Sequence, residues 1–158
     1  KISQMLKSIE GNFDNIEVHD LLIKHFIELR SVSPDGSAHV LDIAGLKVSS
    51  IKFWSLWEGE ELMGIGAIKF LNKTHGEFKS IRVNDKFRNK GFGLKVINHL
   101  INEARKLNIE QLSLETGAGK FFLYARKLFV KCGFKTCDPF AHYEKDVNSV
   151  YMSMLINN

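Results

Sequence analysis

The residues with the clearest chemical potential lie between Lys79 and Lys95. This stretch carries six basic residues and one acidic residue, Asp85, and it includes the hexapeptide Arg88-Asn89-Lys90-Gly91-Phe92-Gly93. A loop of this kind at a helix start presents unpaired backbone N–H groups, and the helix dipole adds positive potential, so phosphate is its natural ligand. Glycine permits unusual φ values and close approach of the backbone to that ligand. The stretch predicts a polyphosphate site; a solvated basic turn is the alternative.

Four further side chains are candidates for acid–base chemistry. Glu77 opens a predicted strand, where a solvent-facing carboxylate is also common, and Glu115 ends the next strand, where it could instead cap the following helix. Either carboxylate has the residue type of a general base. Tyr124 and Tyr143 are proton donors by residue type, although Tyr124 equally suits the core or a pocket wall.

The basic loop joins a strand to a helix. Apolar and polar residues interleave along Phe78–Val83, which suits a half-buried strand. From Gly93 onward the apolar residues have helical spacing, at Ile97, Leu100, Ile101 and Ala104. A further strand, a helix and a glycine stop follow, at Gln111–Glu115, Lys120–Lys131 and Gly133. Strand, helix and strand in succession predict a parallel pair with a right-handed crossover.

The first third of the chain predicts an edge strand and a long helix. The strand lies near Leu6–Ile9, and the helix begins at Asp14, with Glu17 in a capping-box position, and ends in turn chemistry at Ser33-Pro34-Asp35-Gly36. Its apolar stripe is Val18, Leu21, Leu22, His25, Phe26 and Leu29. A short helix is expected around Val40–Leu46.

The remaining strands predict an antiparallel meander and a closing hairpin. They are Ile51–Trp57 and Leu62–Leu71 before the central strand, and Phe134–Thr136 and Ser149–Ile156 at the end of the chain. Together the elements indicate an α/β (α+β) fold, in which a mixed, mostly antiparallel central sheet of six to seven strands has helices on both faces.

Composition indicates one ordinary domain over residues 1–158, with 44% hydrophobic residues for a core. A net charge of +4 is too mild to assign a nucleic-acid partner. No run approaches the ~18 apolar residues of a membrane span, and we expect a cytoplasmic protein without a membrane partner. Two cysteines are too few for a disulfide scaffold, and the six histidines lack metal-ligand spacing, so we expect no metal.

Two motifs in this order resemble the GCN5-related N-acetyltransferase (GNAT) family. Arg88–Gly93 is similar to the family signature (Arg/Gln)-x-x-Gly-x-(Gly/Ala), and Ala125–Phe134 is similar to the family's Ala-x-x-Leu-(Tyr)-x-x-x-Gly-Phe helix end. About forty residues separate them, and the resemblance extends from Ile51 to Ile156. It resembles most a small bacterial-type branch whose acceptor is poorly defined.

The resemblance implies acetyl-CoA as cofactor and a splayed parallel strand pair that holds the thioester. It implies that the Arg88–Gly93 loop holds the pyrophosphate, and that main-chain groups of Ile81, Arg82 and Val83 bind the pantetheine arm, with a backbone N–H near Ile81 or Arg82 for the oxyanion. Glu77 stands eleven residues before Arg88, where the histone-acetylating branch has its glutamate base.

Two positions depart from the family pattern. The tyrosine usual four residues before the Gly-Phe pair is Phe129, and the asparagine usual seven residues earlier is Phe122. A thiolate with a pKa near ~8.5 can depart without a proton donor, so activity does not require that tyrosine. In the acceptor region that the resemblance implies, His39 and Asp42 either contact substrate or are a surface histidine and a helix cap.

The combined hypothesis is an N-acetyltransferase that acts on a primary amine of a small molecule or an exposed protein amine, by direct attack in a ternary complex. A non-catalytic acyl-CoA-binding or regulatory module on the same fold is the first alternative, because the tyrosine is missing. A nucleic-acid-binding domain is the second, although no known nucleic-acid-binding motif is present. Dimers are common for this fold, so a homodimer is possible.

Overall fold

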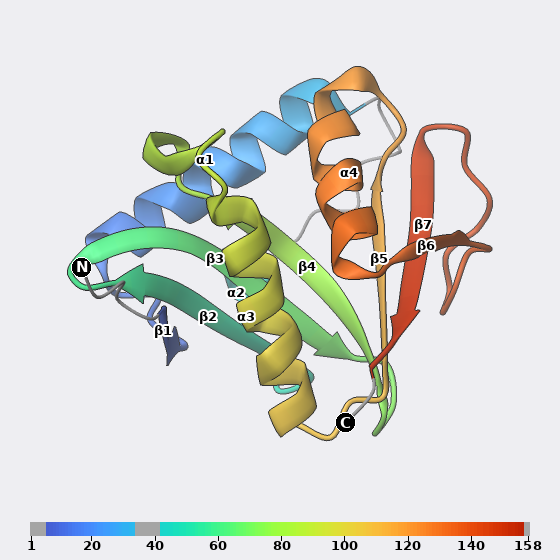
Figure 1. Ribbon diagram of the computed structural model, residues 1–158, viewed down its shortest axis with the longest axis horizontal. Coiled ribbons are helices and arrows are strands. Elements are labelled where there is room, and N and C mark those ends of the chain that lie inside the picture. Colours follow the sequence, from blue (N-terminus) through green and yellow to red (C-terminus); the bar gives the residue numbers. More distant parts are fainter. Residues whose placement is uncertain (1–5, 34–41, 157–158) are drawn as a thin grey trace.

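The computed structural model describes residues 6–33 and 42–156 and shows a seven-stranded mixed sheet in the order β1-β2-β3-β4-β5-β7-β6 (Figure 1). All neighbouring strands are antiparallel except β4 and β5, which are parallel. The predicted fold class is confirmed. The strands are β1 (Lys7–Glu10), β2 (Ile51–Glu58), β3 (Glu61–Phe70), β4 (His75–Val83), β5 (Gln111–Gly117), β6 (Lys135–Cys137) and β7 (Ser149–Leu155).

Helices cover both faces of the sheet. The helices are α1 (Ile16–Val32), α2 (Ile43–Leu46), α3 (Phe92–Lys106) and α4 (Leu123–Cys132), with short 3₁₀ turns at η1 (Asp85–Phe87) and η2 (Lys120–Phe122). The apolar stripe of α1 packs with one face of β2 and β3 in a first core cluster, which includes Leu22 and Ile65. The stripe of α3 packs on the opposite face with Trp54 and Ile68 in a larger cluster. The sheet is therefore sandwiched, as the two helical stripes predict.

The approach of α3 to the sheet depends on one glycine of β3. A Cβ atom at Gly66 would lie 2.4 Å from Leu100 Cδ1, and the Leu100 side chain is fully buried. Glycine at this position lets the helix and the sheet pack at close range.

Strand β4 contains a bulge. Ile65 of β3 pairs with Arg82 and Ala67 pairs with Lys79, so β4 has one residue more than β3 over this interval. Ser80 lies within the bulge and has a φ of 53°. A bulge bends its strand and changes which face the following side chains occupy.

The parallel strands β4 and β5 separate after a short paired stretch. Only three residue pairs join them, and the last is Glu77 with Ser113. Beyond that pair, β5 remains paired with β7 up to Gly117, while β4 remains paired with β3 up to Val83. The predicted splayed pair is therefore present.

Several boundaries differ from those predicted. Helix α1 begins at Ile16, not Asp14, because the side chain of Asn15 accepts the backbone N–H groups of Glu17 and Val18 and so acts as the N-cap. Strand β5 extends past Glu115 to Gly117, which pairs with Ser149. The helix predicted over Lys120–Lys131 is divided into η2 and α4.

The predicted turn after α1 and the first part of the predicted Val40–Leu46 helix, with His39, lie outside the described residues. Asp42 caps α2, since its side chain accepts the N–H of Gly45 at 2.7 Å. Within residues 6–33 and 42–156, no helix has the length and apolar character needed to cross a membrane.

Candidate active site

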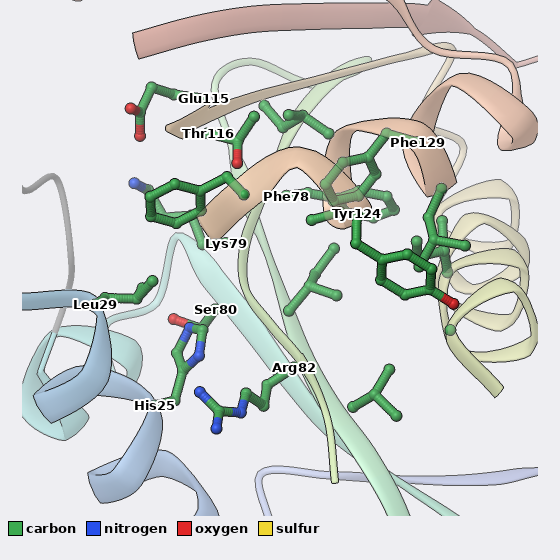
Figure 2. A pocket seen from close by; sticks show the side chains of 18 of the residues that line it. His25, Leu29, Phe78, Lys79, Ser80, Arg82, Glu115, Thr116, Tyr124 and Phe129 are labelled. Carbon is green, nitrogen blue, oxygen red and sulfur yellow. The ribbon is translucent and has the colours of Figure 1, made fainter. Parts of the chain in front are cut away.

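A cavity of about 400 Å³ lies where β4 and β5 separate (Figure 2). Its walls come from α1, from β4 and the loop after it, from α3, from the end of β5 and from η2 and α4. Ligand sites of sheets with parallel strands lie beyond the carboxyl ends of those strands, which is where this cavity is found. Most residues singled out from the sequence line it, namely Glu77, Ile81, Arg82, Val83, Arg88, Asn89, Gly93, Glu115 and Tyr124.

The bulge of β4 divides its side chains between the two faces of the sheet. Phe78, Ile81 and Val83 pack against the core cluster of α3. The alternate positions carry polar side chains on the α1 face, and Arg82 there binds Glu28 of α1. Without the extra residue, Ile81 and Phe78 would point to opposite faces. The polar side chains gathered on the α1 face are Glu77, Lys79 and Arg82.

Glu77 is 2% exposed and sits at the last residue pair between β4 and β5. The Tyr143 hydroxyl donates to Glu77 Oε2 at 2.5 Å, and Lys79 Nζ lies 3.3 Å from the same oxygen. Lys79 Nζ also donates to Tyr143 Oη at 3.2 Å. The solvent-facing alternative for Glu77 is therefore wrong, because a tyrosine and a lysine bind the carboxylate inside the fold.

Tyr143 lies on the long loop between β6 and β7, 66 residues from Glu77. Burial and the neighbouring Glu77 carboxylate raise the pKa of Tyr143 far above its ordinary value. The phenol therefore keeps its proton at neutral pH and acts as a hydrogen-bond donor to the carboxylate. Phe140 contacts the Tyr143 ring edge-on at 5.1 Å and helps to hold the loop over the sheet.

Glu115 lies across the opening from Glu77, at the end of β5. Its Oε2 accepts a hydrogen bond from Ser149 Oγ at 2.7 Å, and its side chain is half-buried. Neither η2 nor α4 has a side-chain N-cap, so Glu115 does not cap the following helix. It remains a carboxylate at the rim of the cavity (Figure 2).

The loop from Asn84 to Gly93 leads from β4 into α3. Gly91 is the N-cap of α3 with a φ of 83°, a left-handed conformation that suits glycine, and no side chain caps this helix start. A Cβ atom at Gly93 would lie 2.5 Å from Leu128 Cδ1 of α4, so a larger residue here would force the Leu128 side chain to move. The first amides of α3 have no capping side chain and are oriented to bind an anion.

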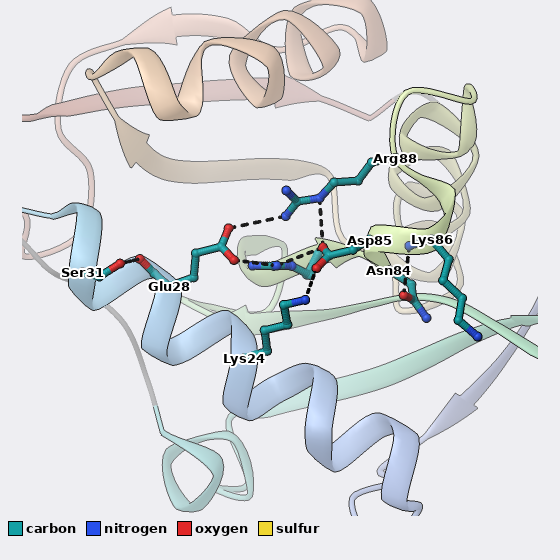
Figure 3. Close-up of polar contacts among 8 residues, drawn as sticks. Lys24, Glu28, Ser31, Asn84, Asp85, Lys86 and Arg88 are labelled. Carbon is teal, nitrogen blue, oxygen red and sulfur yellow. Dashed lines mark hydrogen bonds and ion pairs between the residues drawn. The ribbon is translucent and has the colours of Figure 1, made fainter.

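An ion-pair network joins this loop to α1 (Figure 3). Arg82 Nη2 donates to Glu28 Oε2 at 2.9 Å and to Asp85 Oδ1 at 3.0 Å. Arg88 Nε lies 3.1 Å from Asp85 Oδ1, and Lys24 pairs with the other oxygen of Asp85. The pKa of Asp85 is lowered because these cations outweigh its burial, and Arg82 chiefly lowers the pKa of Glu28. The basic loop is therefore anchored, with Arg88 turned toward α1.

Comparison with known proteins identifies the family. The family profile described as "Acetyltransferase (GNAT) family" matches residues 16–134, which is more than half of the chain. The chain belongs to this family. It is 44% identical over 137 residues to the N-acetyltransferase YsnE of Bacillus subtilis, a match that covers 87% of this chain and 91% of YsnE. This GNAT protein is an N-acetyltransferase that takes its acetyl group from acetyl-CoA.

Solved structures show the same fold. An acyl-CoA N-acyltransferase from Klebsiella pneumoniae superposes with a TM-score of 0.76 at 24% identity, over 96% of this chain and 97% of that one. A Bacillus subtilis acetyltransferase in complex with CoA superposes with a TM-score of 0.70 at 22% identity, over 96% and 99%.

Helix α4 of this GNAT protein presents aromatic side chains to the cavity. Phe129 is 7% exposed and contacts the Phe134 ring edge-on at 5.6 Å, and it occupies the position of the family's usual tyrosine. Phe122 lies against Gly117, where a Cβ atom would come within 2.1 Å of its ring. Tyr124, half exposed, forms part of the cavity wall, one of the two alternatives expected for it.

Two residues of the site, Lys79 and His25, were not predicted as site residues from the sequence. Lys79 was counted only as part of a basic stretch, although its alternation with Glu77 on one strand places both on one face. His25 was placed on the buried stripe of α1, and the structure shows that it also lines the cavity.

Proposed function

We propose that this GNAT protein acetylates a primary amine of a small molecule, or an exposed protein amine, by direct attack on acetyl-CoA in a ternary complex. The observation that carries the proposal is the buried carboxylate of Glu77, which lies where β4 and β5 part and binds Tyr143 and Lys79. A carboxylate at the edge of a cavity this size suits a general base for a small acceptor.

The donor would lie along the open edge of β4. Beyond Glu77 this strand pairs with β3 on one side, and its other edge faces the opening, where an extended pantetheine arm can bond to Ile81, Arg82 and Val83. The amides of Lys90, Gly91, Phe92 and Gly93 would bind the pyrophosphate, with the backbone of Arg88 and Asn89 beside it, since the Arg88 side chain pairs with Asp85 and Glu28. The lack of a side-chain cap at Gly91 supports this placement.

The reaction requires the loss of two protons from the acceptor nitrogen, one before attack and one after it, and a stabilised oxyanion. Glu77 removes a proton from the bound ammonium, directly or through water, and the neutral nitrogen then attacks the thioester carbonyl. A backbone N–H near Ile81 or Arg82 donates to the developing oxyanion. Attack forms the C–N bond and gives the tetrahedral oxyanion, which collapses as the C–S bond breaks, while the nitrogen releases its second proton to solvent. The thiolate leaves and takes a proton from solvent, since its pKa of roughly 8.5 makes it a competent leaving group.

The test is turnover of acetyl-CoA with a panel of primary amines, for wild type and Glu77→Gln. We expect acetylated product from the wild type, and a kcat reduced by about 100- to 1,000-fold in the variant with little change in the KM for acetyl-CoA. An unchanged pH–rate profile in Glu77→Gln would remove this residue as the base. Binding of acetyl-CoA without turnover of any amine would favour the non-catalytic module.

Tyr124 and Glu115 are the alternative catalytic candidates, and the same assay applied to Tyr124→Phe and Glu115→Gln ranks them. A cytoplasmic location and a homodimer complete the proposal; cell fractionation and light scattering test these two parts.

A further inference from the structure

One end of the cavity is lined by a buried histidine, His25, whose ring nitrogens make no hydrogen bond with the described residues. His25 is 5% exposed and lines the cavity, and neither ring nitrogen has a hydrogen-bond partner among the described residues. Figure 2 shows its ring beside Ser80 and the Arg82 guanidinium. Arg82 is also 5% exposed, and its Nε lacks a partner among the described residues, although Nη2 binds two carboxylates. Two buried donors therefore meet at one wall of the cavity.

Such groups reduce stability unless a ligand satisfies them. A buried polar group without a partner has lost its hydrogen bonds to water and gained none in the fold. Burial first, and the Arg82 charge second, lower the pKa of His25 to about 4. The imidazole is therefore neutral at physiological pH and offers one N–H donor and one lone pair. With Arg82 Nε, this wall presents two N–H donors to whatever fills the cavity.

The local charge favours an anionic group. The network beside His25 contains three cations, Lys24, Arg82 and Arg88, and two carboxylates, Glu28 and Asp85. The excess of one positive charge is not balanced within this network. A carboxylate offers two planar acceptor oxygens, which matches two converging N–H donors.

We propose that the acceptor is an amine that also carries a carboxylate, which His25 and the Nε of Arg82 bind while the amine points toward Glu77. This inference rests on the proposed function. Residues 77 and 82 are separated by about 13 Å along β4, allowing for the bulge, and both side chains reach into the same cavity. The amine and the carboxylate of the acceptor must therefore be several bonds apart, as in an ω-amino acid.

The test compares matched acceptors of increasing length. Glycine, β-alanine, γ-aminobutyrate, δ-aminovalerate and ε-aminocaproate are assayed with acetyl-CoA against the ω-amino amide and the alkylamine of each length. We expect the wild type to prefer the longer acids over their amides by about 10- to 100-fold in kcat/KM. Equal rates for acid, amide and alkylamine would overturn the inference and leave N-acetyl transfer intact.

Variants of α1 separate recognition from folding. In His25→Leu we expect the preference for acid over amide to fall toward one, and in His25→Gln, which keeps a donor, we expect partial recovery. His25→Leu removes an unsatisfied polar group, so its Tm should equal or exceed that of wild type. His19→Leu, the same change at an exposed position of the same helix, is the control and should keep the wild-type preference.

A binding measurement distinguishes failure of the subsite from failure of the enzyme. If no amine is turned over, the proposed function is wrong. The carboxylate subsite is then tested by calorimetry, which measures the binding of ε-aminocaproate and of hexylamine to the CoA-loaded protein. Binding of the acid alone, lost in His25→Leu, supports it. Equal binding of both ligands, or binding of neither, overturns it.

Discussion

The buried carboxylate of Glu77 binds two side chains, Lys79 and Tyr143, which contribute different groups. Lys79 supplies a charge on the same strand, and Tyr143 supplies a neutral donor from a loop. A carboxylate held in this way keeps one defined orientation, which a general base needs. Both contacts are to Oε2, so in the proposed mechanism Oε1 would accept the proton of the acceptor amine.

Removal of the Tyr143 hydroxyl is predicted to impair catalysis more than folding. In Tyr143→Phe, Glu77 loses its 2.5 Å hydrogen bond but keeps Lys79, so we expect kcat to fall by about tenfold or more. Tyr124→Phe removes the same atom from the cavity wall formed by α4 and is the comparison variant. A larger loss in Tyr124→Phe would instead make Tyr124 the proton donor to the thiolate. Steady-state kinetics with one amine acceptor measures both.

The sequence predicted some properties of Glu77 and His25 and not others. Glu77 was found by its distance from Arg88, and its burial was not, because Tyr143 is 66 residues away on an irregular loop. His25 was correctly placed on the buried stripe of α1. In the structure His25 lines the cavity beside Arg82 of β4. The apolar periodicity of α1 could not predict this, because it does not indicate which strand the helix packs against.

At the scale of elements, β4 and the loop that follows it build most of the site. The bulge brings Glu77, Lys79 and Arg82 to one face, and the loop then turns into α3 without a capping side chain. A sign of the bulge was present in the sequence. Phe78 and Ile81 are both apolar, although residues three apart cannot share a face of a regular strand. The structure shows that both pack with α3.

The anion site at the start of α3 is tested by one pair of substitutions at Gly91. Asparagine tolerates the left-handed φ of 83°, and a Cβ atom here would meet nothing within 4 Å, so Gly91→Asn should fold. Gly91→Asp has the same shape with one negative charge. We expect Gly91→Asp to weaken CoA binding by at least tenfold relative to Gly91→Asn, as measured by calorimetry. Equal affinities would place the pyrophosphate elsewhere.

At the scale of the whole molecule, the α1 side of the sheet contains both the smaller core and the charged network. His25 lies where they meet, because its neighbours in α1 are apolar while Arg82 and Glu28 are charged. The antiparallel meander, the parallel pair and the two helical layers were predicted from apolar periodicity and the order of the elements. The position of β7 between β5 and β6 was not predicted, and neither was the network, since its members come from α1, β4 and the loop after β4.

This arrangement predicts acid sensitivity. The pKa of His25 is about 4 in the folded protein, below the ordinary value of 6.5. Between these two values the unfolded chain binds more protons than the folded protein, so the free energy of unfolding decreases as the pH is lowered. His75, whose pKa burial also lowers, acts in the same direction. We expect the free energy of unfolding to fall by about 2 kcal/mol between pH ~7 and ~5.

Urea titrations of wild type and His25→Leu at several pH values measure this effect. Most of the pH dependence should vanish in the variant. An unchanged slope would assign the acid sensitivity to other groups. Asp85 and Glu28 have lowered pKa values and lose their contribution only at lower pH, below this window.

The short contact between β4 and β5 has a consequence for the order of events. Three residue pairs form the backbone ladder between the β1-to-β4 strands and the β5-β7-β6 strands, and the larger core cluster packs side chains from both sets of strands on the α3 face. In the proposed function a pantetheine arm would bond to the β4 edge that this short ladder leaves open. We therefore expect initial-rate and product-inhibition kinetics to show acetyl-CoA binding first and the amine second, because the bound donor would complete the wall that the acceptor contacts.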